Sequence, residues 1–465
     1  MISLCHCRRA TTLSWVANNL IHSFFSCGRE SAVFSFIIMA TNNERLLSAL
    51  EQLVSLFFQT ARERPFRLFC LLICPLAALG ICSVYILLHL LAPKPRLPYP
   101  SEKTYITTNS DGTVSDPRPL PCWFDRWRAE GRLKELEHPN SVPEGFPVPS
   151  QPPIEPAEVE ISVVVPAYNE AERIEAGLKE MVEYLDATFG RPSTTAPMKQ
   201  QKNSRPSTPH RIVFKSTPAQ TPPPKGYEIL VINDGSSDDT VKVCLKFSAK
   251  HNLHDIIRVV TLNKNRGKGG GVTHGLRHVR GRYAVFADAD GASKFSDLGR
   301  LIEGCEDVVD GSNRGVAIGS RAHLVGSEAV VKRSAIRNFL MRSFHFVLMI
   351  LTPPATSRIR DTQCGFKLFS RAALPHIVPY MHAEGWIFDI EMLMLAESAP
   401  ATPVLNHEGE VIGTSAGIKV AEVPVGWHEV EGSKMNLVKD SIRMAVGLAV
   451  LRASWMLGVY RRRLT

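Results

Sequence analysis

The chain has 465 residues, of which 44% are hydrophobic and 21% are charged, and its formal net charge is +9. This is the composition of a globular protein, and the length suffices for one large domain or two ordinary ones. The positive charge suits a nucleic acid, an anionic membrane or a phosphate-bearing substrate, and charge alone does not choose among them. The ten cysteines include no paired CxxC set, which argues against a zinc site, and their irregular spacing favours reduced thiols.

The first 67 residues form an N-terminal segment with an unusual beginning. Residues 1–38 are rich in Ser and Thr and contain one acid, Glu30, a pattern shared with transit peptides. The sequence from Met39 onward is typical of an ordinary cytosolic start. We therefore expect residues 1–38 to be an upstream extension of a protein that starts at Met39.

An apolar run follows at residues 68–92, which contain no Asp, Glu, Lys or Arg. A helix needs roughly 20 apolar residues to cross a bilayer core, so this run predicts one transmembrane helix. Pro75 and Gly80 interrupt it, and membrane helices tolerate both residue types better than soluble helices do. A buried core helix is the alternative, and the length of the run argues against it. Basic residues flank both ends, so charge does not orient the span.

Residues 93–158 are rich in proline and polar residues, which predicts a linker with little regular structure. Trp123 and Trp127 stand out within this linker. They indicate a short amphipathic piece that touches either the membrane surface or the domain that follows.

From residue 159 onward, short apolar runs alternate with longer mixed segments. This alternation predicts βαβ units and an α/β fold with a mainly parallel sheet flanked by helices. Ligands of such sheets bind beyond the carboxyl ends of the strands. Residues 191–224 interrupt the pattern with eight prolines, six Lys or Arg and no acid, which predicts a disordered insert. We expect strands at residues 161–165, 228–232, 256–261, 283–287 and 315–318, and helices at residues 170–188, 238–249, 268–280 and 296–309.

The first two predicted strands end in polar motifs. The first motif runs from Pro166 to Glu170 (PAYNE), and the second runs from Asn233 to Thr240 (NDGSSDDT). A carboxylate at a strand end, such as Asp234, can accept hydrogen bonds from a base or a ribose. Helix caps and sharp turns explain much of both motifs without any ligand.

The next two strand ends indicate phosphate and metal chemistry. Residues 263–271 form a glycine-rich turn in which Arg266 and Lys268 can hold phosphate oxygens at a helix start. A flexible basic turn is the alternative, because the order of residues is not that of a P-loop. Asp288 and Asp290 end an apolar strand, and a hard cation such as Mg²⁺ or Mn²⁺ would relieve their repulsion. A simple Asx turn is the alternative there.

Taken together, these motifs resemble those of the inverting family-2 glycosyltransferases with a GT-A fold. Four later motifs, at residues 319–323, 361–369, 386–391 and 431–434, narrow the resemblance to the dolichyl-phosphate β-glucosyltransferases. The resemblance implies a GT-A domain at residues 159–435, UDP-glucose as donor and dolichyl phosphate as acceptor. It also implies a single-pass protein of the endoplasmic reticulum membrane whose catalytic domain faces the cytosol.

The resemblance assigns roles at the donor site. Asp288 and Asp290 would hold Mg²⁺ or Mn²⁺ together with the donor, and Asp290 is the more direct ligand. The metal would neutralise charge on the leaving UDP. The other donor-binding residues would be Pro166, Tyr168, Glu170 and Asp234 around the uridine, Lys268 near the nucleotide, and Lys434 closing over the diphosphate.

The acceptor phosphate is already anionic at pH 7, so it needs alignment and relief from repulsion more than a general base. Asp389 and Glu391 stand where related enzymes place a base, and here we expect them to orient a cation or a sugar hydroxyl. The cations that we expect beside the acceptor are Arg321, Lys332, Arg333 and Arg337. For the last three of these, a solvated helix face is the alternative.

Two further apolar segments suit contact with the lipid. Residues 335–351 and 438–460 resemble amphipathic helices that lie in the membrane interface. The C-terminal region, residues 436–465, ends in a basic tail that suits an anionic leaflet. Ordinary core helices are the alternative for both segments.

Other functions compete with this interpretation. A dolichyl-phosphate mannosyltransferase using GDP-mannose would share the fold, the metal site and the acceptor, and the sugar rests on the resemblance alone. A processive polysaccharide synthase would need several spans, whereas one is predicted. A non-catalytic membrane scaffold is the alternative from another class, and the intact acids argue against it. No recognition motif accompanies the positive charge, so we expect no nucleic-acid partner.

Overall fold

The computed structural model describes the chain in several stretches that form two units, one up to Leu87 and one from Leu88 onward. The predicted extension at residues 1–38, residues 193–223 of the predicted insert, and four candidate site residues lie outside the described stretches; the four are Lys332, Arg333, Arg337 and Lys434. The described residues are 48, 51–52, 54–55, 58–59, 65–137, 154–192, 224–324, 343, 346–405, 411–430 and 437–462.

The predicted transmembrane run forms one long helix, α4 (Pro65–Leu91), with Pro75 inside it. Among the described residues, α4 is the one helix that is long and apolar enough to cross a membrane. Its mean hydropathy is 2.1 over Cys74–Leu91, and only 6% of that stretch is buried. A core helix of a soluble protein would bury far more of its apolar surface.

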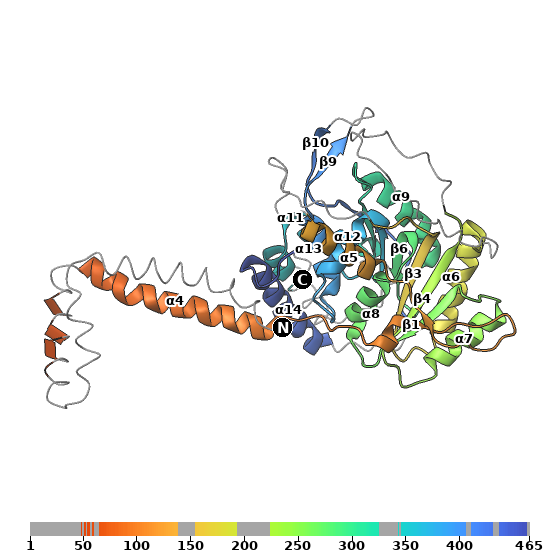
Figure 1. Cartoon of the computed structure of the whole chain (residues 1–465), viewed down its shortest axis with the longest axis horizontal. Coiled ribbons are helices and arrows are strands. Elements are labelled where there is room, and N and C mark those ends of the chain that lie inside the picture. The colour runs from red at the N-terminus through yellow and green to blue at the C-terminus, as the bar shows by residue number, and fades with distance from the viewer. Residues whose placement is uncertain are drawn as a thin grey trace. The chain divides into compact units, whose positions relative to one another are not determined.

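A seven-stranded sheet forms the centre of the second unit (Figure 1). The strands are β3 (Val159–Ala167), β4 (Tyr227–Asn233), β5 (Ile257–Thr261), β6 (Gly281–Ala287), β7 (Val316–Ser320), β8 (Phe366–Ser370) and β11 (Val420–Pro424). Their order across the sheet is β11-β7-β8-β6-β3-β4-β5. β8 is antiparallel to both neighbours, and all other pairings are parallel. The mainly parallel α/β sheet is therefore confirmed, and the ends of β3, β4, β5 and β6 share one edge.

Helices cover both faces of this sheet (Figure 1). One face packs against α6 (Ile174–Phe189), α7 (Thr240–Lys250) and α9 (Leu298–Val308). The other packs against α8 (Gly267–Leu276), α12 (Leu374–Ile377), α13 (Phe388–Glu397) and α14 (Leu437–Met456). Successive strand residues point to opposite faces, so Val163 belongs to the first core and Val164 to the second. The predicted strands and helices of residues 159–309 are all present, with ends shifted by a few residues.

Smaller elements complete the second unit. The strands β9 (Thr402–Leu405) and β10 (Val411–Ser415) pair antiparallel, apart from the main sheet. The short helix α11 (Pro354–Ser357) precedes β8. The described cysteines Cys74, Cys82, Cys122, Cys244, Cys305 and Cys364 are free, as expected.

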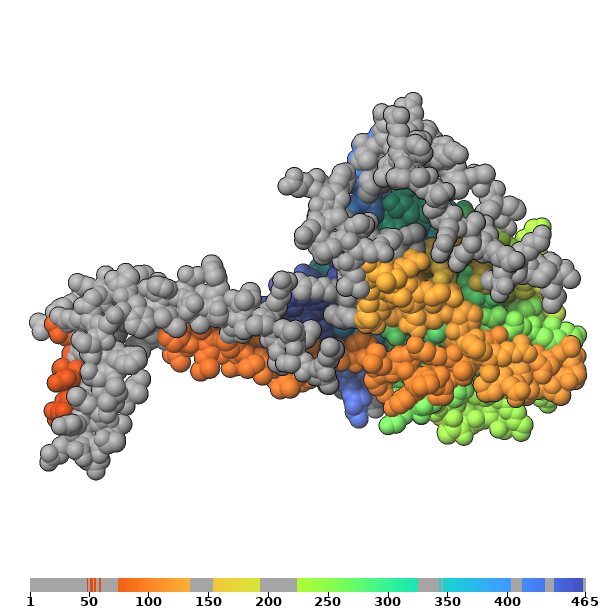
Figure 2. Space-filling model, in the orientation of Figure 1, coloured from red at the N-terminus to blue at the C-terminus, as the bar shows by residue number. Residues whose placement is uncertain are grey.

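The segment after α4 is not the irregular linker that its composition predicts. It forms the short strands β1 (Thr104–Tyr105) and β2 (Arg118–Pro119) and the helix α5 (Trp123–Glu137). Trp123 is 2% exposed, and its Nε1 donates a hydrogen bond of 2.7 Å to the carbonyl of Leu276. Figure 2 shows the segment in orange across the surface of the second unit. Trp123 therefore anchors the segment to the second unit, which composition alone could not reveal.

Helix α14 combines both interpretations of the C-terminal apolar segment. Met444, Leu448 and Leu451 are buried in the core below the sheet. Ile442 and Val446 are 59% and 58% exposed. The helix is thus a core helix on one face and presents an apolar surface on another, and its contact with a membrane stays a prediction.

Candidate functional site

Two strand-end turns are joined by hydrogen bonds at the carboxyl edge of the sheet. The turn after β3 contains Asn169, whose backbone N donates to Ser236 Oγ at 2.9 Å. In return, the backbone N of Ser237 donates to Asn169 Oδ1 at 2.8 Å. Asn169 has a φ of 54°, a left-handed conformation that asparagine tolerates better than most residues. The two predicted motifs therefore form one rigid rim.

Asp234 lies behind this rim and is 3% exposed. Its Oδ1 accepts a hydrogen bond of 2.6 Å from the backbone N of Arg266. Burial raises the pKa of Asp234 to about 6, although hydrogen bonds from the backbone of Arg266 and Gly267 oppose the rise. Of the other residues predicted near a uridine, Tyr168 is 40% exposed, and Glu170 pairs with Arg173 at 2.5 Å.

A charged cluster lies beside the end of β6. Lys268 Nζ is 2.6 Å from Asp288 Oδ1, so the first turn of α8 meets the predicted metal site. Burial alone would lower the pKa of Lys268, but Asp288 and Asp389 outweigh it and raise that pKa. Burial also raises the pKa of Asp389, although Lys367 and Lys268 oppose it. Three predicted site residues therefore belong to one electrostatic unit.

Lys367 is the member of this cluster that sequence reasoning missed. It is fully buried in β8, where its Nζ pairs with Asp389 and donates a 2.7 Å hydrogen bond to the carbonyl of Cys364. The sequence signal that could have identified it is a lysine inside the apolar run of residues 366–369. A charge in a buried strand needs a partner of opposite charge, so such a lysine indicates a nearby carboxylate. The antiparallel strand β8 thus brings a cation to the edge where β6 ends.

Asp288 and Asp290 fit a hard divalent cation that also binds non-protein oxygens. Asp288 uses Oδ1 for Lys268, and Asp290 Oδ1 accepts a 3.1 Å bond from the backbone N of Ala292. The Oδ2 atoms are then the candidate ligands. No cluster of three or more His, Cys, Asp or Glu suited to a metal occurs in the described part of the chain. Mg²⁺ commonly uses one or two carboxylates with phosphates and water, so two carboxylates suffice.

The absence of a side chain at Gly365 leaves room for the carboxylate of Asp288. A Cβ atom on Gly365 would lie 2.0 Å from Asp288 Oδ2, closer than any real contact. Only glycine therefore permits β8 to begin this close to the carboxylate.

Arg321 is held by an acid that the sequence did not reveal as its partner. Its Nε and one terminal nitrogen donate to the two oxygens of Asp361 at 2.7 and 2.8 Å. Burial alone would lower the pKa of Arg321, and the bonds to Asp361 raise it instead. Its side chain remains 31% exposed. The predicted acceptor cation is thus present at the end of β7, with much of its charge compensated.

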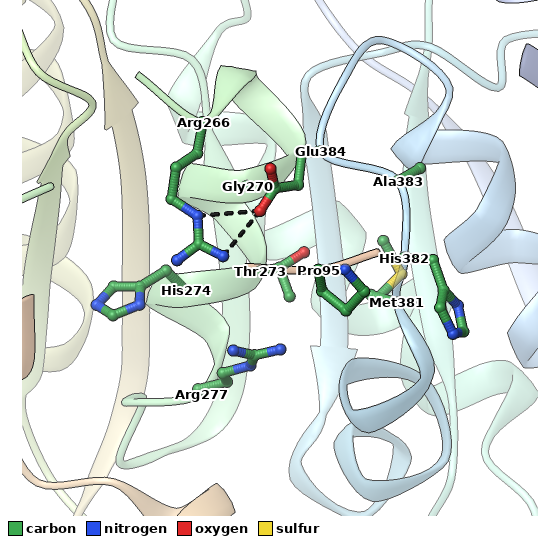
Figure 3. A pocket seen from close by; sticks show the side chains of 10 residues that line it. All are labelled: Pro95, Arg266, Gly270, Thr273, His274, Arg277, Met381, His382, Ala383 and Glu384. Carbon is green, nitrogen blue, oxygen red and sulfur yellow. Dashed lines mark hydrogen bonds and ion pairs between the residues drawn. The ribbon is translucent and has the colours of Figure 1, made fainter. Parts of the chain in front are cut away.

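Arg266 and Glu391 fix loops instead of facing a ligand. Arg266 is 6% exposed, and its Nε donates to Glu384 Oε1 at 3.0 Å (Figure 3). Arg96, from the segment after α4, also pairs with Glu384 at 2.9 Å. Glu391 accepts hydrogen bonds from the backbone N of His382 and of Ala383, at 2.8 and 2.7 Å. Of the two residues predicted to hold phosphate oxygens, only Lys268 therefore reaches the charged cluster.

The sequence of this chain is similar to those of known glycosyltransferases. The glycosyl transferase family 2 model matches residues 211–374. The dolichyl-phosphate β-glucosyltransferase of Saccharomyces cerevisiae is 37% identical over 389 residues, which are 82% of this chain and 92% of that protein. The chain belongs to the dolichyl-phosphate β-glucosyltransferase family. Family members from Dictyostelium discoideum and Homo sapiens are 34% and 37% identical; the matches cover 73% and 65% of this chain, and 87% and 78% of those proteins.

Membership in this family makes the chain a glycosyltransferase and confirms the resemblance seen in its motifs. Solved structures are more distant from it. Glucosyl-3-phosphoglycerate synthase from Mycobacterium tuberculosis is 16% identical with a TM-score of 0.39, covering 63% of this chain and 80% of that one. At this distance the likeness does not define a shared site, so residue roles rest on this chain's own geometry.

Proposed function

We propose that this protein transfers glucose from UDP-glucose to dolichyl phosphate with inversion and so supplies dolichyl β-glucosyl phosphate for lipid-linked oligosaccharide assembly and protein N-glycosylation. The observation that carries the proposal is the 37% identity to the yeast family member over 92% of its length. In the reaction, the bond from glucose C1 to the UDP oxygen breaks, and UDP leaves with the electron pair. A phosphate oxygen of dolichyl phosphate forms the new bond to C1.

The donor would lie along the shared carboxyl edge of the sheet. Asp234, Tyr168, Pro166 and Glu170 would hold the uridine, because the joined turns after β3 and β4 bring them together. Lys268 would meet the diphosphate from the start of α8, where the backbone dipole also favours an anion. Lys434 would close over the diphosphate, and it lies outside the described residues.

Asp288 and Asp290 would hold Mg²⁺ or Mn²⁺ through their carboxylate oxygens. The metal would supply Lewis-acid neutralisation of the leaving diphosphate. Asp389 is buried against Lys367, so its role here is to fix the cations of the cluster. A general base is not required, since the acceptor phosphate is already anionic.

The acceptor phosphate would be aligned by Arg321, with Lys332, Arg333 and Arg337 from the neighbouring undescribed segment as further candidates. Asp361 holds the Arg321 guanidinium in one orientation through two hydrogen bonds. An oriented guanidinium loses less entropy when it binds a phosphate. Much of its charge is shared with Asp361, so Arg321 would orient the phosphate more than it would neutralise it.

We also propose a single-pass protein of the endoplasmic reticulum membrane, anchored by α4, with its catalytic unit facing the cytosol. The length and apolar composition of α4 support the anchor. The exposed apolar residues of α14 would lie in the membrane interface and help the long lipid reach the site.

A donor-choice assay tests the proposed function. Membranes containing the full chain are incubated with dolichyl phosphate, Mg²⁺ or Mn²⁺, and either labelled UDP-glucose or labelled GDP-mannose. We expect label from UDP-glucose alone in the lipid phase, and we expect chelation of divalent cations to stop the transfer. Transfer from GDP-mannose would overturn the donor, and transfer from neither would favour a non-catalytic scaffold.

A further inference from the structure

A cavity lies beside the segment that follows α4. Its volume is about 460 Å³, within the range of small-molecule sites. Arg96 lines it from that segment, Phe124 from α5, and Arg277 from the end of α8. Arg277 follows Lys268 by nine residues, which is about 14 Å along a helix axis. The cavity is therefore separate from the donor site, which lies at the other end of α8.

The cavity wall is strongly cationic. It carries Arg96, Lys103, Arg128 and Arg277 but only one carboxylate, Asp125. Lys103 pairs with Asp125 at 2.7 Å, and Arg96 pairs with Glu384. Two other titratable groups line the cavity: burial lowers the pKa of His278 to about 4 and raises the pKa of the Cys122 thiol to about 11, so both are neutral at physiological pH. The wall thus has more cations than carboxylates, and no described carboxylate forms an ion pair with Arg277.

Arg277 is the focus of this excess. Its Nε is buried and has no hydrogen-bond partner among the described residues. Figure 3 draws the adjoining pocket, which Arg277 also lines; there no hydrogen bond or ion pair joins its guanidinium to the other residues drawn, whereas Arg266 donates to Glu384. Burial and Arg266 lower the pKa of Arg277 to about 10, and Asp125 and Glu384 offset only part of this. Arg277 is partly buried, and no described carboxylate is paired with its guanidinium, so an anion in the cavity would supply the missing partner of the buried Nε.

A purely structural role of Arg277 does not account for its unpartnered Nε. Arg277 caps the C-terminus of α8, where the helix dipole favours a cation. Its guanidinium also lies 5.0 Å from the ring centre of Phe124. Both contacts stabilise a cation modestly, and neither offers an acceptor to the buried Nε.

The cavity is also lined by residues that follow closely, along the chain, the end of the proposed membrane helix. Pro95 and Arg96 follow the end of α4 at Leu91 by four and five residues, which limits their distance from the helix end to roughly 14–18 Å. The intervening chain is fixed to the catalytic unit, because Tyr460 Oη donates to the carbonyl of Pro93 at 2.6 Å. Arg266 also donates to the carbonyl of Arg96 at 2.5 Å. Basic pockets next to a span typically hold lipid phosphates.

We propose that this cavity binds the phosphate of an anionic phospholipid headgroup, with Arg277 as its principal partner. The inference rests on membrane attachment through α4 and does not depend on which sugar is transferred. The headgroup phosphate would accept hydrogen bonds from Arg277 and Arg128, while Phe124 and Leu97 would contact the glycerol and the upper acyl chain. The lipid would thus hold the catalytic unit against the bilayer.

The test measures the thermal unfolding of the purified full chain in neutral detergent. The probes are short-chain phosphatidic acid, short-chain phosphatidylcholine and inorganic phosphate. We expect phosphatidic acid to raise the Tm in a saturable way, phosphatidylcholine to do so less because its choline meets a cationic wall, and inorganic phosphate to have little effect. Arg277→Gln should not lower the lipid-free Tm, since it removes a partly buried cation whose Nε has no partner, and should weaken phosphatidic acid binding at least roughly tenfold.

Two further variants keep the result interpretable. Arg282→Gln removes an exposed arginine that also lies over an aromatic ring, at 5.2 Å from Tyr283, and it should leave lipid binding unchanged. Arg128→Gln should weaken lipid binding if Arg277→Gln does not fold. An equal response to inorganic phosphate would overturn the lipid assignment. An unchanged lipid response in both cavity variants, or no response of the natural protein, would overturn the site.

Discussion

The carboxylates at the donor edge have different environments, and these set different roles. Asp234 is buried and accepts hydrogen bonds from the backbone of Arg266 and Gly267, whereas Asp288 forms an ion pair with Lys268. A carboxylate with a raised pKa suits hydrogen bonding to a neutral base or ribose. A carboxylate beside a lysine and a second acid suits a cation and a diphosphate. The ends of β4 and β6, which lie on either side of β3, would therefore supply separate chemistry to the proposed nucleotide-sugar donor.

The raised pKa of Asp234 predicts a pH dependence of donor binding. The ionised form is lost as pH falls through about 6, and only about one tenth remains at pH 5. If the ionised form binds uridine, the KM for UDP-glucose should rise roughly tenfold between pH 7 and pH 5. Steady-state kinetics at saturating dolichyl phosphate measure this directly.

Asp234→Asn is the matched variant, because its side-chain oxygen can still accept the bond from Arg266. It should show a high KM that no longer varies over this pH range. Folding raises the pKa of Asp234 from 3.8, so the ionised carboxylate destabilises the fold at neutral pH, and the variant should have a higher Tm at pH 7.5. A KM of the natural protein that stays flat to pH 5 would remove Asp234 from the donor site.

Gly365 predicts a second effect at the residue scale. Gly365→Ala would place a methyl group on Asp288 Oδ2 and displace the carboxylate, since the undisturbed distance is 2.0 Å. We expect at least a roughly tenfold higher concentration of divalent cation for half-maximal transfer, with little change in secondary structure by circular dichroism.

Gly385→Ala is the control, because nothing lies within 4 Å of a Cβ atom at that position. It should leave the cation requirement unchanged. A Gly365→Ala variant with the natural requirement would show that Asp288 is not a ligand.

At the scale of elements, the segment from Pro95 to α5 acts as a strap that links the end of α4 to the catalytic unit. Ile106 bridges to Val259 at the free edge of β5, and Trp123 binds the C-terminus of α8. Covering an edge strand removes unpaired backbone groups from solvent. The strap therefore stabilises the same helix whose first turn carries Lys268.

Trp123 provides a graded test of this strap. Trp123→Ala removes a nearly fully buried ring and should cost about 3–5 kcal/mol, whereas Trp123→Phe mainly loses the bond to Leu276 and should cost about 1–2 kcal/mol. Thermal unfolding in detergent should therefore rank the natural protein above Trp123→Phe and that variant above Trp123→Ala. Equal Tm values for all three would mean that the segment is a loose linker after all.

At the scale of the whole molecule, a hydrophobic core lies on each face of the sheet. The proposed donor site lies at the carboxyl edge of the sheet, between these two cores. The predicted insert enters after α6 and returns before β4. Its two ends meet in space, because a Cβ atom on Gly226 would lie 2.6 Å from the nitrogen of Pro192. Because the two ends of the insert lie close together, the insert can be removed without distorting the sheet.

We therefore predict that replacing residues 193–223 with a short Gly-Ser linker leaves both folding and transfer nearly unchanged. Turnover with UDP-glucose and the Tm of the natural and shortened chains are the two measurements. A folded but inactive shortened chain would mean that these residues contribute to the site, and an unfolded one would mean that they support the core.

Much of this molecule could be predicted from its sequence. The periodicity of apolar residues predicted the strands and helices of the first half of the catalytic unit. This is possible because the two-residue repeat of a strand and the 3.6-residue repeat of a helix are visible within a short stretch of sequence. Turn residues at strand ends predicted that Asp234, Lys268, Asp288 and Asp290 lie at the same edge of the sheet, since a parallel sheet gathers such ends there; their roles stay predictions. The apolar run at residues 68–92 gave α4 by length alone.

Other features were decided only by the tertiary structure. Arg321 meets Asp361 across 40 residues, and Arg266 meets Glu384 across 118, so no local pattern marks either pair. The direction of β8, which places Lys367 beside Asp389, depends on how the chain returns to the sheet. The composition of the strap predicts a linker, because proline and polar content report local flexibility. Its order comes instead from a few contacts of tryptophan side chains and backbone groups with distant residues. Local composition thus determined the elements and their chemistry, and long-range packing determined which charges are compensated and which, like Arg277, are left for a ligand.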